Sequence, residues 1–375
     1  MFNGYTHQYR HLFTRDLFEI YFLLAFRALG FSMIGIFLPL FLLVELQFPL
    51  QNVVFFFMMI TFSFALGNYL ALSLISRFGA KHAMIWSYLF LVFGFLFTYF
   101  LESYPFLYLF AAFYQGLSMG MFWMGFHIDV ALHSRKKVMG KQSGLISFAS
   151  ILGAVIGPLL GGFILKYLGF GSLFLIVIGV FIISILPFLF SRDLYVKTDF
   201  DFRSLFVTKH LKYFLGYFAQ GVRATAGGVF WPIFIFSIFG SYLTLGWYGS
   251  LATLFIGILC YFIGELSDHW KKGFLIRLSA PFESLIWVVR IFVMNVTGVF
   301  LVGFLGGMSS VGIDVPLLAK TYGRTKKEKA AAFLFFREMS IRIGEMFALL
   351  LVLFLGSLQS SFIASAVVSF FYLFF

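Results

Sequence analysis

The side chains in this sequence that could do chemistry are charged groups embedded in long apolar stretches. They are five arginines and five carboxylates: Arg27, Arg223, Arg290, Arg337, Arg342, Asp129, Glu283, Asp314, Glu338 and Glu345. An ionisable group in apolar surroundings is costly, so such groups mark either a binding pathway or a paired network. The guanidinium group suits anion binding, because its planar fork holds a phosphate or carboxylate through two hydrogen bonds and stays charged.

One stretch brings both signs of charge to a single helix face. Glu338, Arg342 and Glu345 recur at i, i+4 and i+7, which places them on one side of a helix. Carboxylates in apolar surroundings can exchange protons in the working range, so Glu338 and Glu345 are candidates for coupling to protons. Arg342 opposes this role by favouring the ionised carboxylates. Simple neutralisation of arginines by buried glutamates is the alternative to a role in transport.

The composition explains what the apolar stretches are. Of the 375 residues, 61% are hydrophobic and only 11% are charged, whereas soluble domains carry about 25% charged residues. A globule of this size could not cover its surface with so few charges, so the sequence predicts a polytopic membrane protein. The single cysteine, Cys260, excludes an internal disulfide. No residue set has metal-ligand spacing or pairs a nucleophile with a base, so we expect no metal, no cofactor and no enzymatic activity.

A bilayer crossing needs about 20 mostly apolar residues. This rule predicts an all-helical fold with twelve transmembrane helices, near 17–44, 50–75, 83–101, 105–129, 143–165, 171–191, 212–239, 242–266, 274–294, 297–319, 330–356 and 358–375. Most of the 27 Lys and Arg residues fall in the N-terminus and in the connections after even-numbered spans. The positive-inside rule therefore predicts a multi-pass protein of the cell membrane, plasma or inner, with both termini cytoplasmic. The net charge of +12 then follows from the orientation of the chain in the membrane and does not indicate nucleic acid as a partner.

Short internal matches predict a duplicated six-helix unit. Pro39 in the first span corresponds to Pro232 in the seventh, and Asp129 at the end of the fourth span corresponds to Asp314 in the tenth. Repeats of this kind are typical of transporters. We expect an N-terminal six-helix bundle over 1–191, a cytoplasmic linker over 192–211 and a C-terminal six-helix bundle over 212–375.

The loops that follow the second and eighth spans share a motif. The later one reads Gly264-Glu265-Leu266-Ser267-Asp268-His269-Trp270-Lys271-Lys272 and resembles the G-x-L-x-D-R-x-G-R-R signature of the major facilitator superfamily. The earlier one keeps Arg77, Gly79 and Lys81 but has Ser76 in the place of the aspartate. A carboxylate in such a turn can meet a helix terminus or a basic group and close the cytoplasmic side. We expect a cytoplasmic gate made by Arg77, Gly79, Lys81, Gly264 and Asp268, with Asp129 and Asp314 beside it.

The fifth span has the most specific pattern, a set of small residues with one proline: Gly144, Gly153, Gly157, Pro158, Gly161 and Gly162. Small residues at this spacing flatten one helix face so that a neighbouring helix packs closely, and the proline adds a local bend. The pattern resembles the fifth span of the drug-and-proton antiporters of the superfamily. In the fourth span, Gln115-Gly116 is similar to the R-x-x-Q-G element of the superfamily, with Ala112 in the place of its arginine.

The resemblance to the major facilitator superfamily implies a secondary transporter in which two six-helix bundles rock around a midplane cavity. Arg27 and Arg223 lie near mid-depth in the first and seventh spans, which line that cavity in the superfamily. They would then grip an organic anion from both halves, as in the organophosphate antiporters of the superfamily. We expect substrate contacts at Arg27, Arg223, Arg342, Gln115, Trp123 and Trp231.

Two alternatives stay open. The glycines of the fifth span and the aromatic content fit multidrug efflux of lipophilic compounds by proton antiport, although the missing arginine at Ala112 speaks against the standard mechanism. A non-transporting sensor or assembly partner with the same fold would carry a soluble appendage, and the longest polar segment is the linker. The expected partners are a small-molecule substrate, protons or a counter-substrate, and the lipid bilayer around a monomer.

Overall fold

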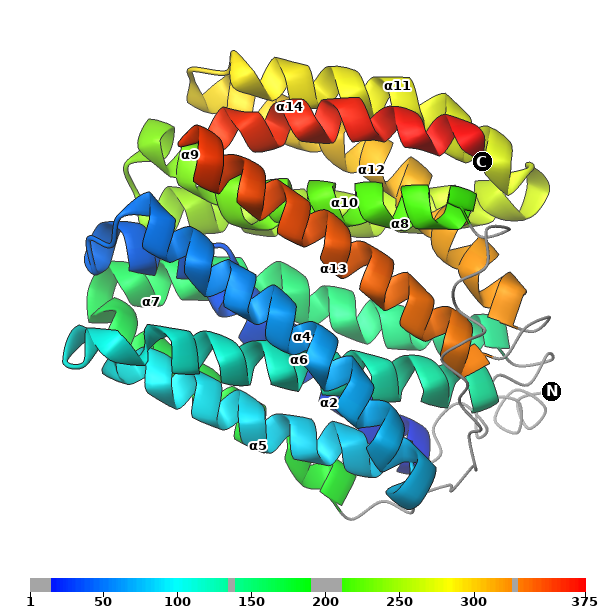
Figure 1. The fold of residues 1–375 in the computed structure, drawn as a ribbon, viewed down its shortest axis with the longest axis horizontal. Helices are drawn as coiled ribbons and strands as arrows, with labels where there is room; N and C mark the ends of the chain where they lie inside the picture. Colours follow the sequence, from blue (N-terminus) through cyan, green and yellow to red (C-terminus); the bar gives the residue numbers. More distant parts are fainter. Residues whose placement is uncertain (1–14, 134–138, 190–210, 326–329) are drawn as a thin grey trace, which may run out of the picture.

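The computed structural model describes residues 15–133, 139–189, 211–325 and 330–375, and all regular structure in these ranges is helical. We call the described residues 15–189 the N half and the described residues 211–375 the C half. Residues 192–210 of the predicted linker, 192–211, lie outside the described residues, and its last residue is the first residue of α8. Figure 1 shows the helices of both halves running roughly side by side along the long axis of the molecule.

The N half contains the first six predicted spans. Its elements are α2 (Arg15–Gly35), α3 (Leu38–Leu40), the π-helical η1 (Phe41–Glu45), α4 (Leu50–Phe78), α5 (Ala80–Tyr99), the short η2 (Phe100–Glu102) and η3 (Pro105–Leu107), α6 (Tyr108–His133) and α7 (Met139–Leu189). The connection predicted between the fifth and sixth spans is only a kink in α7, at Gly169, whose φ of 76° breaks the helical geometry. Glycine allows this conformation because it has no Cβ atom.

The C half contains the other six spans. Its elements are α8 (Leu211–Thr225), the π-helical η6 (Ala226–Phe230), α9 (Trp231–Phe239), α10 (Tyr242–His269), α11 (Lys272–Ile291), α12 (Val296–Thr325), α13 (Ala330–Leu355), α14 (Leu358–Ser369) and η7 (Phe370–Phe374). Seven described stretches are long and apolar enough to cross a bilayer. One of them, Ser150–Leu189, has 40 residues, which at the helical rise is about 60 Å, enough to cross twice. With α6, α11, α13 and the α14–η7 pair, the fold has the twelve predicted crossings.

The helices of the two halves pack in the same pattern. In the N half, α2 packs on α7, α6 packs on both α4 and α5, and α5 also packs on α7. In the C half, the corresponding pairs are α8 with α13, α12 with α10 and α11, and α11 with α14. The first span of each half is also interrupted by a π-helical turn next to a proline, Pro39 or Pro232. The structure therefore contains the duplicated unit that the short sequence matches predict.

The glycines of the fifth span lie where α7 approaches two neighbouring helices. A Cβ atom at Gly153 or Gly161 would collide with backbone carbonyls of α2, at Ala25 and Met33 respectively. A Cβ atom at Gly162 would instead meet the Tyr242 carbonyl at the start of α10. The glycines of the motif therefore permit two close helix contacts, one with α2 inside the N half and one with α10 of the C half. Gly144 lies in α7, in a part whose packing is outside the described residues.

The two halves meet along two pairs of helices. On one side α7 packs on α10, where Pro158 contacts Gly246 and the Leu159 amide donates to Ser250 Oγ at 3.0 Å. Pro158 bends the helix locally, and Ser250 of the other half accepts from an amide beside this bend. On the other side α4 packs on α13, and the two cross the middle of the molecule next to each other (Figure 1). These two contacts, α7 with α10 and α4 with α13, are related by the repeat.

We define the basic end of the molecule as the end where α6 and α12 finish and where α8 and α13 begin. It lies at the right of Figure 1, together with the C-terminal residue. The turn after α4 lies there as well and is made by Gly79, with φ of 95°. The corresponding turn of the C half is made by Trp270 and Lys271, because Gly264 is still inside α10.

We expect Gly161→Ala to destabilise the protein, because its Cβ atom would meet the backbone at Met33 of α2, which cannot move aside as a side chain can. Overpacking of this kind costs about 1–3 kcal/mol, so the melting temperature in detergent should fall. Gly179→Ala is the matched control in the same helix, since no atom lies within 4 Å of its Cβ position. Equal melting temperatures for the two variants would contradict the packing role of Gly161.

Candidate functional site

A cavity of about 210 Å³ lies between the two halves. We call it the central cavity. The N half contributes wall residues from α2 to α6, and the C half contributes residues from α8, η6 and α13. The polar part of the wall consists of Thr61, Gln115, Thr225, Arg342 and Glu345. The rest is mostly aromatic and aliphatic, which is the usual make-up of a small-molecule site.

Arg342 and Glu345 form an ion pair in the wall of this cavity. Arg342 Nη1 donates to Glu345 Oε2 at 2.6 Å, and the Thr61 hydroxyl of α4 donates to the same carboxylate oxygen at 3.2 Å. The guanidinium carbon lies 3.9 Å from the centre of the Phe64 ring, also on α4. The pair therefore belongs to α13 of the C half but is held in place by α4 of the N half.

Gln115 is the other fixed polar group in the wall. Its amide nitrogen donates to the Thr98 hydroxyl at 2.7 Å, and that hydroxyl donates in turn to the Gly94 carbonyl. Gly94 also leaves the space that Gln115 occupies, because a Cβ atom there would lie 2.7 Å from the glutamine side chain. The sequence around Gln115 thus holds its amide in one orientation.

Arg223 is used inside the C half. Its Nε donates to Glu283 Oε1 of α11 at 2.8 Å, and its Nη1 approaches Asp314 Oδ1 of α12 at 3.4 Å. Nη1 also donates to the Tyr372 hydroxyl at 2.9 Å. Arg223 is 6% exposed. We call Arg223, Glu283 and Asp314 the triad.

Glu283 is the most saturated carboxylate in the described structure. Besides the Arg223 bond it accepts hydrogen bonds from the Trp287 indole and from the hydroxyls of Ser309 and Ser310. The neighbouring Arg290 makes no ion pair with it and instead stacks on Trp287, with the guanidinium carbon 4.0 Å from the ring centre. Glu283 and Arg290 lie seven residues apart on α11, but the ion-pair partner of Glu283 is Arg223 of α8.

Arg27 lies in an aromatic cage within the N half. Its guanidinium carbon is 3.6 Å from the centre of the Phe122 ring, 4.7 Å from that of Phe31 and 5.2 Å from that of Tyr88. The group is 4% exposed, and neither Nη atom has a hydrogen-bond partner in the described residues. Phe31 is also a wall residue of the central cavity, so Arg27 is separated from that cavity by one ring.

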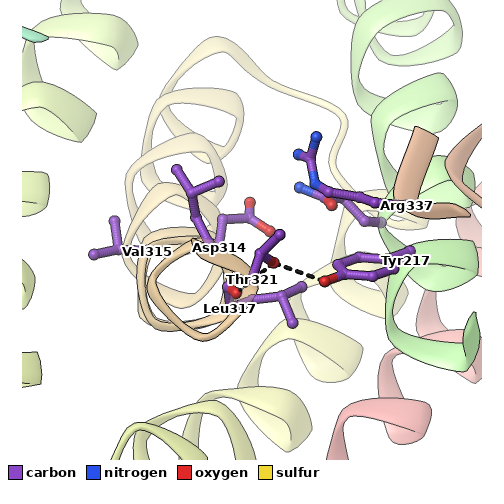
Figure 2. Close-up of a pocket in the computed structure, with 8 residues that line it drawn as sticks. Tyr217, Asp314, Val315, Leu317, Thr321 and Arg337 are labelled. Atoms are coloured by element: carbon purple, nitrogen blue, oxygen red, sulfur yellow. Dashed lines mark hydrogen bonds between the residues drawn. The ribbon is translucent and has the colours of Figure 1, made fainter. Parts of the chain in front are cut away.

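A second cavity, of about 160 Å³, lies in the C half among α8, α12 and α13. We call it the triad cavity, because Asp314 lines it. Figure 2 shows the Asp314 carboxylate, the Arg337 side chain and the hydrogen-bonded pair Tyr217–Thr321 around it. Gln220 completes the polar lining, and its Oε1 atom is buried without a hydrogen-bond partner among the described residues.

The halves are joined at the basic end by a polar cluster, which we call the gate cluster. His127 of α6 lies 2.8 Å from the Tyr322 hydroxyl of α12 through Nδ1, and Arg337 of α13 donates to its Nε2 at 3.4 Å. Arg337 also hydrogen-bonds Glu338, whose carboxylate lies 3.8 Å from His127 Nε2. The N half contributes His127 to this cluster, and the C half contributes the other three residues.

An apolar cluster surrounds the polar gate. It joins the basic-end parts of α4, α5 and α6 to the start of α13, and its buried members are Ala71, Leu72, Ile75, Ala80, Ala83, Leu117, Met121, Met124, Ile128, Ala331, Ala332, Leu334 and Phe335. At the opposite end, Tyr242 of α10 meets Phe37 and Phe170 of the N half. The halves thus touch at both ends of the central cavity.

Comparison with known proteins decides the family. The model of the Major Facilitator Superfamily matches residues 20–208, just over half of the chain. The chain belongs to the Major Facilitator Superfamily. It is therefore a multi-pass membrane protein and a secondary transporter rather than an enzyme. The search of curated proteins gave no match.

Solved structures of transporters share the fold over nearly the whole chain. A crystal structure of a POT family transporter in complex with a thioalcohol-conjugated peptide has a TM-score of 0.76 at 12% identity, covering 96% of this chain and 95% of its own. Another POT family transporter, in complex with 5-aminolevulinic acid, has a TM-score of 0.77 at 10% identity and the same coverage. A point mutant of the nucleoside transporter NupG has a TM-score of 0.74 at 11% identity, covering 96% of this chain and 98% of its own.

The structure brings together only part of the predicted substrate set. Gln115 and Arg342 are wall residues of the central cavity, whereas Arg27, Arg223, Trp123 and Trp231 are not among them. The Trp231 indole donates to Tyr248 at 2.9 Å, and Trp123 stacks on His127. In this structure each tryptophan contacts another side chain of its own half. The coupling candidates divide in the same way, since Glu345 faces the central cavity and Glu338 belongs to the gate cluster.

The predicted gate residues are spread over the basic end. Arg77 is exposed, and the Lys81 ammonium lies 5.3 Å from the centre of the Phe188 ring. Asp314 is paired with Arg223 of its own half rather than with a loop. Asp129 is half-buried near the end of α6, and the side chain of Asp268 lies outside the described residues. The polar contacts between the halves at this end come from residues outside the predicted gate set, namely His127, Tyr322 and Arg337.

We expect Tyr322→Phe to loosen the basic end, because it removes a hydrogen bond between the halves. Loss of a bond worth about 1 kcal/mol raises the open fraction roughly fivefold. The measurement is the labelling rate of a cysteine at Thr225, in the wall of the central cavity, by an impermeant maleimide added at the basic end of a Cys260→Ser protein. Tyr261→Phe, on the exposed side of α10, is the control. Unchanged labelling in Tyr322→Phe would show that this bond does not hold the halves together.

Proposed function

We propose that this transporter carries a small organic anion and binds it at Arg342 in the central cavity. The observation that supports this is the position of Arg342, the one cationic side chain among the described wall residues of the cavity between the halves. A guanidinium favours carboxylate and phosphate groups over neutral ones, because it offers a fixed fork of charged donors. Stacking on Phe64 fixes the plane of that fork.

Glu345 controls access to this site. Its carboxylate occupies one donor of the Arg342 guanidinium, whereas Arg342 Nε is buried without a partner in the described residues. An anionic substrate would therefore compete with Glu345 for Arg342. Protonation of Glu345 would remove that competition and so favour binding of the anion to Arg342.

Binding at this place would also act on the contact between the halves. Thr61 of the N half donates to Glu345 of the C half, so displacement of Glu345 removes a hydrogen bond between α4 and α13. A substrate that replaces this bond can bias the rocking of the two bundles, since a ligand shifts an equilibrium by its difference in affinity for the two states. The basic end would face the cytoplasm, in accord with the positive-inside rule.

The pair Arg27 and Arg223 is not our choice for the anion site. Arg223 already has two carboxylate partners, which leaves it little attraction for a third anion. Arg27 has no such partner among the described residues, but the Phe31 ring would have to turn before a substrate could reach it. One similar POT family structure is in complex with 5-aminolevulinic acid, a carboxylic acid, and an anion-binding Arg342 would suit a ligand of that class.

The second candidate is efflux of lipophilic compounds. It is favoured by the apolar majority of the cavity wall, which includes Phe31, Phe57 and Phe95 together with Ile34, Ile60 and Leu349. Such a wall can hold an amphipathic molecule without any use of Arg342. The two candidates therefore differ in what the loss of the Arg342 charge would do.

We expect a panel of carboxylates and phosphate esters to raise the melting temperature of the purified protein, and Arg342→Gln to abolish the shift. A ligand at 100 times its Kd stabilises the folded state by about 2.7 kcal/mol, which a melting scan detects. Arg77→Gln, an exposed arginine at the basic end, should keep the wild-type response. Shifts caused only by lipophilic cations, or kept in Arg342→Gln, would favour the efflux candidate instead.

A further inference from the structure

Asp314 differs from the other carboxylate of the triad in its surroundings. The Asp314 side chain is 40% exposed and lines the triad cavity, whereas the Glu283 side chain is 1% exposed. Glu283 accepts from four different side chains, but the only donor to Asp314 among the described residues is Arg223, at 3.4 Å. Arg223 thus holds Glu283 firmly and Asp314 loosely.

The hydrogen-bonded triad carries two carboxylates against one guanidinium. With both carboxylates ionised, the triad itself has one negative charge in excess, next to the guanidinium groups of Arg290 and Arg337. A proton on either carboxylate would neutralise the excess. Asp314 is the group that can take it, because Glu283 would lose several charge-assisted bonds on protonation and does not line the cavity.

The cavity that Asp314 lines also contains an unused acceptor, on Gln220. Its Oε1 atom is an acceptor without a donor in the described part of the chain, and it belongs to a residue that lines the same cavity. An ionised carboxylate has only acceptor oxygens and cannot satisfy this atom, whereas a protonated one has an O–H to donate. The triad cavity therefore contains an acceptor that fits the protonated form.

The charged groups around Asp314 disfavour a metal cation. Arg223 faces it from α8 and Arg337 from α13, while Glu283 of α11 is its one acidic neighbour among the described residues. The remaining titratable neighbours are Tyr217, Tyr372 and Cys260. Two guanidinium groups beside the cavity repel a sodium ion, whereas a proton needs only one carboxylate oxygen.

We propose that Asp314 binds and releases the coupling proton of this transporter, and that Arg337 transmits its charge state to the gate cluster. Arg337 lines the triad cavity together with Asp314 (Figure 2) and at the same time hydrogen-bonds His127 and Glu338. An ionised Asp314 attracts Arg337 toward the triad cavity and away from His127 of the other half. A protonated Asp314 leaves Arg337 in the gate cluster, so protonation favours the closed basic end.

This proposal rests on the transporter fold and not on the nature of the substrate, so its test needs no substrate. The readout is the labelling of the cysteine at Thr225 in the Cys260→Ser protein, measured in acidic and in alkaline buffer. Each rate is divided by the rate for the same thiol in denatured protein, which removes the pH dependence of the thiol itself. We expect the wild-type ratio to fall several-fold on acidification.

The variants separate Asp314 from the other titratable groups. Asp314→Asn should show the low, acid-like labelling at both pH values, and Asp314→Glu should restore the response. Glu102→Gln, which changes an exposed carboxylate at the opposite end of the N half, should respond as the wild type does. A pH response that survives in Asp314→Asn, or that is lost only in His127→Asn, Glu338→Gln or Glu345→Gln, would overturn the proposal.

Infrared difference spectra between the two buffers give a direct view of the proton. The wild-type protein in lipid should show the carbonyl band of a protonated carboxyl group in acid, and one component of this band should be absent in Asp314→Asn and present in Glu102→Gln. An unchanged band in Asp314→Asn would contradict proton binding there, even if that variant were too unstable for labelling. Failure of the anion screen would affect neither readout.

Discussion

The need to neutralise charge without bulk water shapes the whole interior of this protein. A charged group in an apolar bundle requires a partner of opposite sign or an aromatic face. In the C half, Arg223 binds Glu283, Arg337 binds Glu338 and Arg342 binds Glu345. The first pair joins α8 to α11, whereas the other two lie within α13. They also place charge at three levels: the central cavity, the triad cavity and the gate cluster.

Close backbone packing explains how such a charged interior can still change shape. Within the halves, glycines bring α2 against α7 and α8 against α13 so closely that no side chain fits between them. Between the halves, the two helix pairs α7–α10 and α4–α13 form separate, repeat-related contacts. The halves are therefore stiff units that meet along two seams, an arrangement suited to rocking. Polar contacts across these seams, such as Thr61 with Glu345, are easily exchanged for contacts with a ligand.

The sequence predicts the architecture better than it predicts the site. Hydropathy alone is enough for the twelve crossings, because each span must satisfy its own backbone in the bilayer. The spacing of charged residues along the sequence also identifies Arg342 and Glu345, which share one helix face. It does not predict that Arg223 joins Glu283, since partners on different helices depend on how the helices pack.

For the same reason Arg27 and Arg223 do not line the central cavity together, and the roles of Tyr322 and Gln220 have no sequence signal. Glu19 near the start of α2 is buried, with an exposed fraction of 4%, although hydropathy does not mark a charge at a span end as embedded. Periodicity identifies which residues share a face of one helix. Periodicity does not tell which neighbouring helix that face packs against, and the composition of the binding site depends on this packing.

The central claim is that the two halves move as rigid units, so that one end of the central cavity opens as the other closes. Distances between spin labels on the two halves test it most directly, in a Cys260→Ser protein. One pair joins Arg77 and His269 at the basic end, and the other joins Ser103 and Asn295 at the opposite end; all four residues are exposed. We predict that a change from acidic to alkaline buffer lengthens the first distance and shortens the second. Distances that rise together, or that stay fixed at both ends, would contradict the account.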